Sequence, residues 1–152
     1  MKLSQHFTLA EATRSMTATR CGIDNTPGPE VAKAMINVCE NILEPIRKHY
    51  DIPYTPSSFY RCPELNEKLG SKNTSQHCKG EAVDIEIPGI ANIKLARMIE
   101  NQMDFDQLIL EFYTPGVDDS GWVHVSYVSP QDNRQEVLTI TKDKTIVGLP
   151  GK

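Results

Sequence analysis

The stretch Ser75–Asp84, which reads SQHCKGEAVD, joins a polar loop to a segment whose pattern predicts a buried strand. His77 lies at the end of the loop and Asp84 lies inside the strand. A carboxylate among strand aliphatics needs a partner, because burying an unpaired charge is very costly. Far downstream, His124 lies in a second strand-like segment, Trp122–Ser126. Two imidazoles and one carboxylate are the three protein ligands of a catalytic zinc, with the fourth position left for water.

Three segments alternate between apolar and polar residues, as strands with one buried face do. They are residues 82–87, 106–113 and 122–127, and their predicted core faces carry Val83, Ile85, Ile87, Leu108, Leu110, Phe112, Val123, Val125 and Tyr127. If these strands are neighbours in one sheet, Asp84, Glu111 and His124 project from the opposite face. The alternation therefore predicts a second carboxyl group, that of Glu111, beside the proposed ligands.

Other patterns predict helices that cover the apolar face of this sheet. Residues 29–49 carry apolar side chains at three- and four-residue steps, and Pro45 is expected to kink the last turn. A second amphipathic helix is expected over 92–101. Thr8 and Glu11 have the spacing of a capping box for one short helix in the N-terminal arm.

The remaining expected elements are a strand over 54–60, a short helix from Pro63 to Gly70, a polar loop over 71–76, a loop over 114–121 and a hairpin over 136–149. This order of elements indicates an α+β domain with a mostly antiparallel sheet. We expect helices on one face of the sheet and a zinc cleft on the other.

Composition narrows the class of protein. The 152 residues, of which 39% are hydrophobic and 24% charged, fit one domain spanning 1–152 with a substantial core. A net charge of −4 does not favour nucleic-acid binding, for which a clustered basic surface is typical. No apolar run reaches the ~20 residues of a membrane helix, and the first six residues lack the apolar core of a secretory signal. We expect a monomer without nucleic-acid or membrane partners.

The four cysteines, Cys21, Cys39, Cys62 and Cys78, show no CxxC spacing. A zinc ribbon or a thioredoxin-type centre is therefore not indicated. A chain of this length does not depend on a disulfide scaffold, so we expect mostly free thiols.

Taken singly, each proposed ligand also has an ordinary structural interpretation. His77 is a loop histidine of the kind that is usually solvated, and His124 fits a hydrogen-bonded histidine within a sheet. His6 and His49 lie outside any motif and are given no role. From the residues alone, a zinc site and purely structural roles for His77, Asp84 and His124 fit the sequence about equally well.

The motif Ser75-x-His77-x-x-Gly80-x-Ala82-x-Asp84, followed by Trp122-Val123-His124, resembles the signature of the zinc D-alanyl-D-alanine carboxypeptidases. These belong to a wider group of bacterial and phage murein peptidases whose fold is shared with the hedgehog signalling domain. Further similar segments are 7–11, 22–27, 57–62 with Asn66, and 105–112, so the resemblance spans roughly residues 5 to 130 and points to a small single-domain branch.

The resemblance implies roles for individual residues. His77, Asp84 and His124 match the zinc ligands, and Arg61 matches an arginine that contacts the substrate near the scissile carbonyl. Ser75 matches a motif serine near the metal. Gln76 beside it and Trp122 are expected to contact substrate as well, although Trp122 fits core packing equally well.

The sequence departs from the family at one catalytic position. Several relatives carry a glutamate three residues before the last zinc ligand, and here that residue is Gly121. We expect Glu111 to be the general base instead, with Glu86, Asp118 and Asp119 as rivals. An alternative role for Glu111 is to orient a ligand imidazole.

The resemblance implies a zinc peptidase that cleaves next to a D-amino acid in peptidoglycan stem peptides, either as a carboxypeptidase or as a murein endopeptidase. The alternative is a zinc-containing binding module of the same fold, because a fold alone does not establish catalysis. Without an export signal, such a protein fits a phage endolysin or a cytoplasmic enzyme that reaches the wall after release.

Overall fold

Five strands form one sheet, in the order β1-β3-β2-β4-β5. The structure, a computed structural model, describes residues 1–72 and 75–151. The strands are β1 (Ala82–Ile85), β2 (Gln107–Glu111), β3 (Trp122–Ser126), β4 (Glu136–Ile140) and β5 (Thr145–Val147). Only β2 and β4 pair in parallel, and the other three pairings are antiparallel. The predicted α+β fold with a mostly antiparallel sheet is confirmed.

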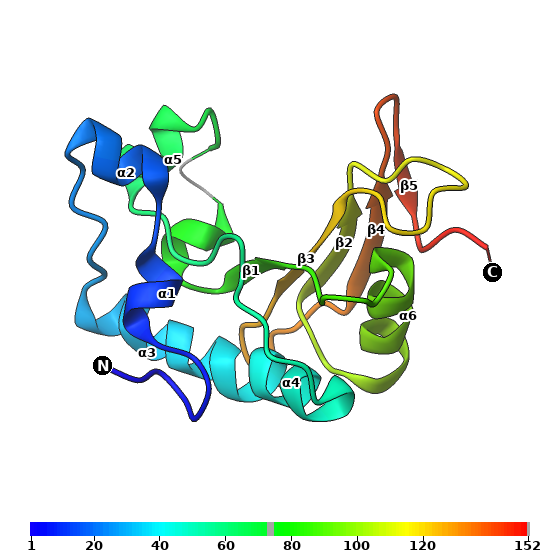
Figure 1. The fold of residues 1–152 in the computed structure, drawn as a ribbon, viewed down its shortest axis with the longest axis horizontal. Coiled ribbons are helices and arrows are strands. Elements are labelled where there is room, and N and C mark those ends of the chain that lie inside the picture. The colour runs from blue at the N-terminus through cyan, green and yellow to red at the C-terminus, as the bar shows by residue number, and fades with distance from the viewer. Residues whose placement is uncertain (73–74, 152) are drawn as a thin grey trace.

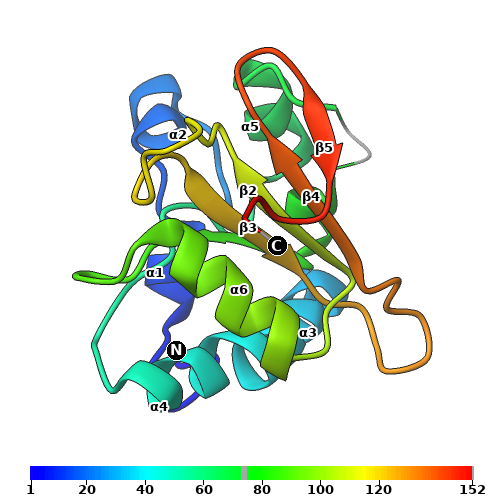
Figure 2. The same cartoon turned by 90° about the vertical axis from the view of Figure 1, so that its right-hand side faces the viewer.

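One face of the sheet forms the core. Val83, Ile85, Leu108, Leu110, Val123 and Val125 have no exposed surface. They belong to one hydrophobic cluster with residues of the helices α3 (Pro29–Val38), α4 (Glu44–Tyr50) and α6 (Asn92–Gln102). Figure 1 shows α3 and α4 along one edge of the molecule, and Figure 2 shows α6 lying across the sheet. The apolar residues at every second position of the strands are therefore those that face the helices.

The long helix expected over 29–49 is interrupted by a wider turn. Between α3 and α4, residues Cys39–Leu43 form a π-helical segment. Pro45 lies two residues beyond this segment. Its ring nitrogen cannot donate a hydrogen bond, and the ring would crowd the carbonyl of Asn41 in a regular α-helix. The π turn relieves that conflict without ending the helix, as expected for a proline at this position. No helix among the described residues is long and apolar enough to cross a membrane.

The N-terminal arm holds two short helices, not the single one expected. In α1 (Leu9–Thr13), Thr8 and Glu11 form the predicted capping box. A second helix, α2 (Met16–Cys21), begins because the Ser15 hydroxyl accepts the backbone N–H of Ala18. The remaining helices are α5 (Pro63–Lys68) and the 3₁₀ helix η2 (Gln76–Lys79). The four cysteines are free thiols, as expected.

The strand predicted over 54–60 is wrong. This segment is irregular and makes one isolated bridge, between Ser58 and Asp84. Pro53 and Pro56 lack the N–H groups that a continuous ladder needs, so pairing is limited to the residues after Pro56. There the backbone N–H of Ser57 donates to the Asp84 carbonyl at 2.9 Å, and the N–H of Asp84 donates to Ser58.

The assignment of Phe112 to the core face is also wrong. β2 ends at Glu111, and Phe112 adopts a left-handed backbone conformation with φ of 52°. This turn rotates the side chain outward, where 59% of its surface is exposed. Of the loop expected over 71–76, residues 73 and 74 lie outside the described residues, and Gln76 already belongs to η2. The predicted C-terminal hairpin is present as β4 and β5.

A buried carboxylate fastens the segment after β3 to the start of β2. Asp106 accepts hydrogen bonds from the backbone N–H, Nε and Nη2 of Arg134 at 3.0, 3.0 and 2.8 Å. Its Oδ2 also accepts from Nε2 of Gln76 at 3.0 Å. These bonds from Arg134 hold the pKa of Asp106 below its usual range, although burial opposes the shift.

We expect Asp106→Asn to lower the free energy of unfolding at neutral pH by about 1–3 kcal/mol, because an amide cannot accept all four bonds. The folded-state pKa of Asp106 is the lower one, so the stabilisation is complete above the ordinary Asp pKa of about 3.9. It is lost as the pH falls from there through the folded-state pKa. Urea unfolding of wild type and variant should therefore show a gap that closes on acidification.

The matched control is Asp104→Asn, at an exposed aspartate two residues away. Its effect should stay within about 0.5 kcal/mol. A gap between wild type and Asp106→Asn that persists unchanged in acid would contradict the assignment.

Candidate metal centre

The first proposed ligand, His77, is held by the short helix η2. The Ser75 hydroxyl caps this helix by accepting the backbone N–H of His77 at 3.2 Å. Gly80 ends it with φ of 71°, and a Cβ at Gly80 would come within 2.7 Å of the Met35 side chain. The motif serine and glycine therefore shape the backbone that presents His77, and only glycine fits the contact with α3.

The other two ligands face each other across neighbouring strands. Asp84 on β1 and His124 on β3 are register partners. Nδ1 of His124 lies 2.9 Å from Oδ1 of Asp84, and Nε2 of His77 lies 3.5 Å from the same oxygen. One donor atom from each residue lies within 4.8 Å of the others. The tertiary fold thus brings together all three residues that the sequence singled out.

The donor set suits a small divalent cation. Donor atoms at about 2.0–2.1 Å from a tetrahedral zinc lie roughly 3.3–3.5 Å apart. The 3.5 Å between His77 and Asp84 matches this spacing, and all three donor atoms lie within 4.8 Å of one another. The Phe59 carbonyl lies 2.7 Å from Nδ1 of His77 and can only accept, so Nδ1 of His77 carries the proton. This leaves Nε2 of His77 free to bind a metal, as outer partners of ligand histidines commonly arrange.

The two histidines determine the charge state of Asp84. Only 7% of this residue is exposed, and burial alone would raise the pKa of its carboxyl group. The hydrogen bond from His124 and the close contact with His77 outweigh burial and hold the pKa of Asp84 below its usual range. The Asp84 carboxylate is therefore anionic at neutral pH, as a metal ligand needs to be.

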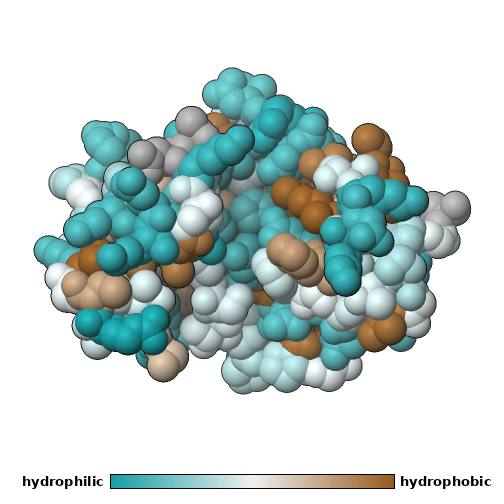
Figure 3. All heavy atoms as spheres, turned by 90° about the horizontal axis from the view of Figure 1, so that it is seen from above, coloured by the Kyte–Doolittle hydropathy of each residue, from teal (hydrophilic) through white to brown (hydrophobic). Residues whose placement is uncertain are grey.

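The three side chains lie in a cleft of about 520 Å³. Its lining consists of Arg61, Leu69, Ser71, Ser75, His77, Asp84, Glu111, Phe112, Trp122 and His124. Seen from above in Figure 3, the surface is hollowed between the two sides of the molecule, and hydrophilic residues cover much of the hollow. The volume is within the usual range for ligand sites.

Glu111 is the carboxyl group in this cleft besides Asp84. Its register partner on β3 is Trp122, two residues before His124. Burial raises the pKa of Glu111 above its usual value, while the charge of His124 opposes the shift. A carboxyl group with a raised pKa is suited to accept and return protons.

The rival carboxylates lie elsewhere. None of Glu86, Asp118 and Asp119 is among the residues that line the cleft, and all three are exposed. Glu86 instead accepts a hydrogen bond from Asn92 at 3.0 Å, at the start of α6. Strand alternation would place Glu86 on the same face as Asp84. Because β1 ends at Ile85, this alternation does not extend to Glu86.

Gly121 shows why this chain has no glutamate at the position where several relatives have one. Its φ is 67°, and a Cβ there would lie 1.9 Å from the carbonyl oxygen of Glu111. No side chain fits that space. The close approach of Gly121 to the end of β2 is therefore incompatible with a glutamate at 121. The contact involves only the backbone of Glu111, whose side chain lines the cleft.

Arg61 closes the side of the cleft opposite the sheet. Its Nε donates to the Ser58 hydroxyl at 3.0 Å, and its Nη1 and Nη2 donate to Asn66 and Asp84 at 3.4 and 3.5 Å. Its backbone N–H donates to the His77 carbonyl at 3.2 Å. The guanidinium is thus held at the metal ligands without a regular strand to support it.

Asn25 holds the backbone on both sides of Arg61, a role that the sequence patterns did not reveal. Its side-chain amide donates to the Tyr60 carbonyl at 3.0 Å and accepts the N–H of Cys62 at 2.7 Å. Asn25 is buried although polar, and it lies in one of the segments that resemble the peptidase family. The resemblance was the available sequence signal for Asn25. Its hydrogen bonds to Tyr60 and Cys62 depend on the tertiary fold.

The residues expected to contact substrate occupy different places. Ser75 and Trp122 line the metal cleft, and Trp122 stacks on Phe112 with ring centroids 5.1 Å apart. Phe112 is a lining residue that the sequence reasoning missed. Gln76 does not line this cleft, because its amide is bonded to Asp106; it lines an adjoining hollow instead.

We expect Gly121→Ala to destabilise the fold by about 1–3 kcal/mol beyond the cost of a positive φ, because the added methyl overlaps backbone atoms. Gly116→Ala is the matched control, since Gly116 has φ of 86° but a Cβ added there would meet nothing within 4 Å. Unfolding in urea measures both variants. Equal losses of stability would show that the contact with Glu111 does not exclude side chains.

A metal-competent His-Asp-His cluster in a polar cleft with an additional carboxyl group is the kind of site found in metallopeptidases. A model of the family described as Peptidase M15 matches residues 5–126. The chain therefore belongs to the peptidase M15 family, and the predicted relation to the zinc D-alanyl-D-alanine carboxypeptidases is confirmed. A search of curated proteins finds no match. Family membership makes the chain a peptidase in general kind, without specifying its substrate.

Proposed function

We propose that the protein is a zinc peptidase that hydrolyses peptide bonds next to D-amino acids in the stem peptides of peptidoglycan, as a D,D-carboxypeptidase or a murein endopeptidase. The observation that carries the proposal is the meeting of His77, Asp84 and His124 in one cleft with Glu111. The family match supports peptidase chemistry. The sequence resemblance supports the proposed substrate class and, with it, a reaction at the cell wall.

In this proposal Nε2 of His77, the Asp84 carboxylate and Nδ1 of His124 would hold the zinc. Two nitrogens and one oxygen are a donor set typical of catalytic zinc sites. Bound zinc would lower the pKa of a water toward ~7 and polarise the scissile carbonyl. The Phe59 carbonyl keeps the His77 imidazole in the required tautomer.

The chain's own residues move the protons and hold the substrate. Glu111 takes a proton from the attacking water and passes it to the leaving amine, which its raised pKa favours. Arg61 stabilises the oxyanion or holds a substrate carboxylate, since the planar guanidinium suits both tasks. Ser75 and the Trp122–Phe112 stack wall the bound peptide, and Gln76 contacts it beyond the metal.

A second candidate function is a non-catalytic, zinc-containing module that binds the wall or another protein. The replacement of the family's glutamate by Gly121 is the observation that favours it. Release of new amino groups from purified peptidoglycan, measured with and without a chelator, separates the two functions. Chelator-sensitive release supports the peptidase, and binding without release supports the module.

We expect His77→Ala, Asp84→Ala and His124→Ala each to abolish stoichiometric zinc binding, because each removes one of three ligands. Elemental analysis of the dialysed proteins provides the measurement. His49→Ala is the matched control, because His49 lies on α4 outside the cleft, and it should retain zinc. A ligand variant that keeps one zinc per chain would refute the assignment of that residue.

We expect Glu111→Gln to keep its zinc and to lose about 10²–10⁴-fold in turnover, because the amide cannot accept the proton. Turnover is measured as amine release from peptidoglycan by the zinc-loaded proteins. The rival Glu86→Gln removes an exposed carboxylate outside the cleft and should remain near wild type. Near-normal activity in Glu111→Gln would eliminate Glu111 as the base.

A further inference from the structure

Two hollows adjoin the metal cleft at different parts of its lining, and we propose from this that the protein is an endopeptidase. Its substrate would extend well beyond the scissile bond in both directions. The inference rests on the proposed function and decides between its two forms. A carboxypeptidase needs a site that ends about one residue past the reacting bond, whereas an endopeptidase needs a groove open at both ends.

The first adjoining hollow, of about 710 Å³, lies on the η2 side of the sheet. It shares Ser75, Glu111 and His124 with the metal cleft. Its further lining is largely polar and includes Gln76, Lys79, Glu81, Asp106 and Arg134. Because the shared residues include a metal ligand and the proposed base, a peptide leaving the metal on this side enters the hollow directly.

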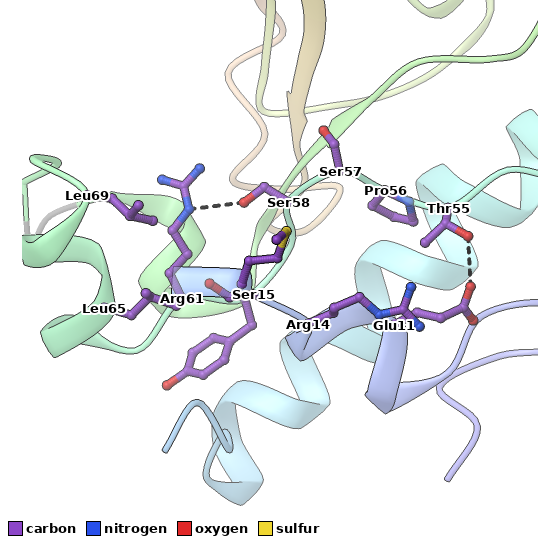
Figure 4. A pocket seen from close by; sticks show the side chains of 12 residues that line it. Glu11, Arg14, Ser15, Thr55, Pro56, Ser57, Ser58, Arg61, Leu65 and Leu69 are labelled. Atoms are coloured by element: carbon purple, nitrogen blue, oxygen red, sulfur yellow. Dashed lines mark hydrogen bonds between the residues drawn. The ribbon is translucent and has the colours of Figure 1, made fainter. Parts of the chain in front are cut away.

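The second adjoining hollow, of about 420 Å³, lies beyond Arg61. It shares Arg61 and Leu69 with the metal cleft. Figure 4 shows Arg61 bonded to Ser58 on one side of this hollow, and Glu11 bonded to Thr55 on the other. The space between them is also bordered by Arg14, Ser15, Met16 and Ser57.

The position of Arg61 argues against a closed end. In a carboxypeptidase site, a cation on the end wall would hold the terminal carboxylate of the substrate. Here the guanidinium stands between two hollows, held by donations from Nε, Nη1 and Nη2 to Ser58, Asn66 and Asp84, and each Nη keeps one further N–H for the substrate. Arg61 is thus a side wall that a peptide passes, suited to the oxyanion at the scissile bond.

The two outer hollows also indicate the character of the peptide. Each presents both signs of charge, with Glu11 and Arg14 in one and Lys79 and Glu81 in the other. A stretch carrying both amines and carboxylates complements such walls, while an apolar peptide does not. Binding energy from these remote contacts would assist the chemical step only for substrates long enough to reach them.

The test uses the zinc-loaded full chain and purified peptidoglycan. New amino groups are counted, and the products are separated by mass spectrometry into free single amino acids and larger peptide fragments. We expect fragments to exceed free amino acids by about tenfold, because a truncated leaving group forfeits the remote contacts. Release of free amino acids alone would overturn the inference and leave the proposed function standing. The absence of any new amine would refute the proposed function and the inference together.

Filling each outer hollow provides an independent test. Thr55→Trp and Lys79→Trp place an indole at exposed lining positions of the two hollows. Each should slow fragment release about tenfold by blocking remote contacts. Thr145→Trp on β5, exposed and lining neither the cleft nor either hollow, is the matched control and should leave release unchanged. Zinc content at wild-type level verifies folding, and release by both hollow variants equal to the control would overturn the proposal.

Discussion

The structure depends on the burial of one carboxylate, that of Asp84. A charge with so little exposure is tolerated only where partners surround it, and His124, His77 and Arg61 supply them. These partners come from β3, from η2 and from the irregular segment after Pro56. A one-residue slip of β1 against β3 would direct Asp84 into the aliphatic core, so the register of the sheet and the geometry of the metal centre are determined together.

The end of β2 shows how local backbone geometry decides which residue is available for chemistry. Gly121 packs so closely on Glu111 that no side chain can occupy position 121. The ladder ends at Glu111, after which Phe112 turns outward and stacks on Trp122. The tight contact thus excludes a glutamate at the position where several relatives have one, while Glu111 and the aromatic pair beside it line the cleft.

The segment 59–62, on the side of the cleft opposite the sheet, has no regular secondary structure. Individual hydrogen bonds hold it in place. Asn25 binds the backbone before and after Arg61, and Phe59 contributes a carbonyl that orients His77. This arrangement connects the N-terminal arm to the metal centre. It also borders the hollow beyond Arg61, which residues of α1, α2 and the segment around Thr55 line on the other side.

The sequence by itself predicted the strands β1, β2 and β3, their apolar face and the three candidate ligand residues that the fold brings together, because alternation and a specific motif depend on neighbours along the chain. It also identified Glu111, since period two continues up to the last residue of β2. It failed at Phe112 and over 54–60, where a left-handed residue and two prolines end the alternation that the pattern assumes. Only the tertiary structure decided that Gly121 excludes a side chain, that Gln76 turns to Asp106 and that Asn25 holds Arg61. Each of these depends on atoms distant in the chain approaching within a few ångströms, and no local pattern records such contacts.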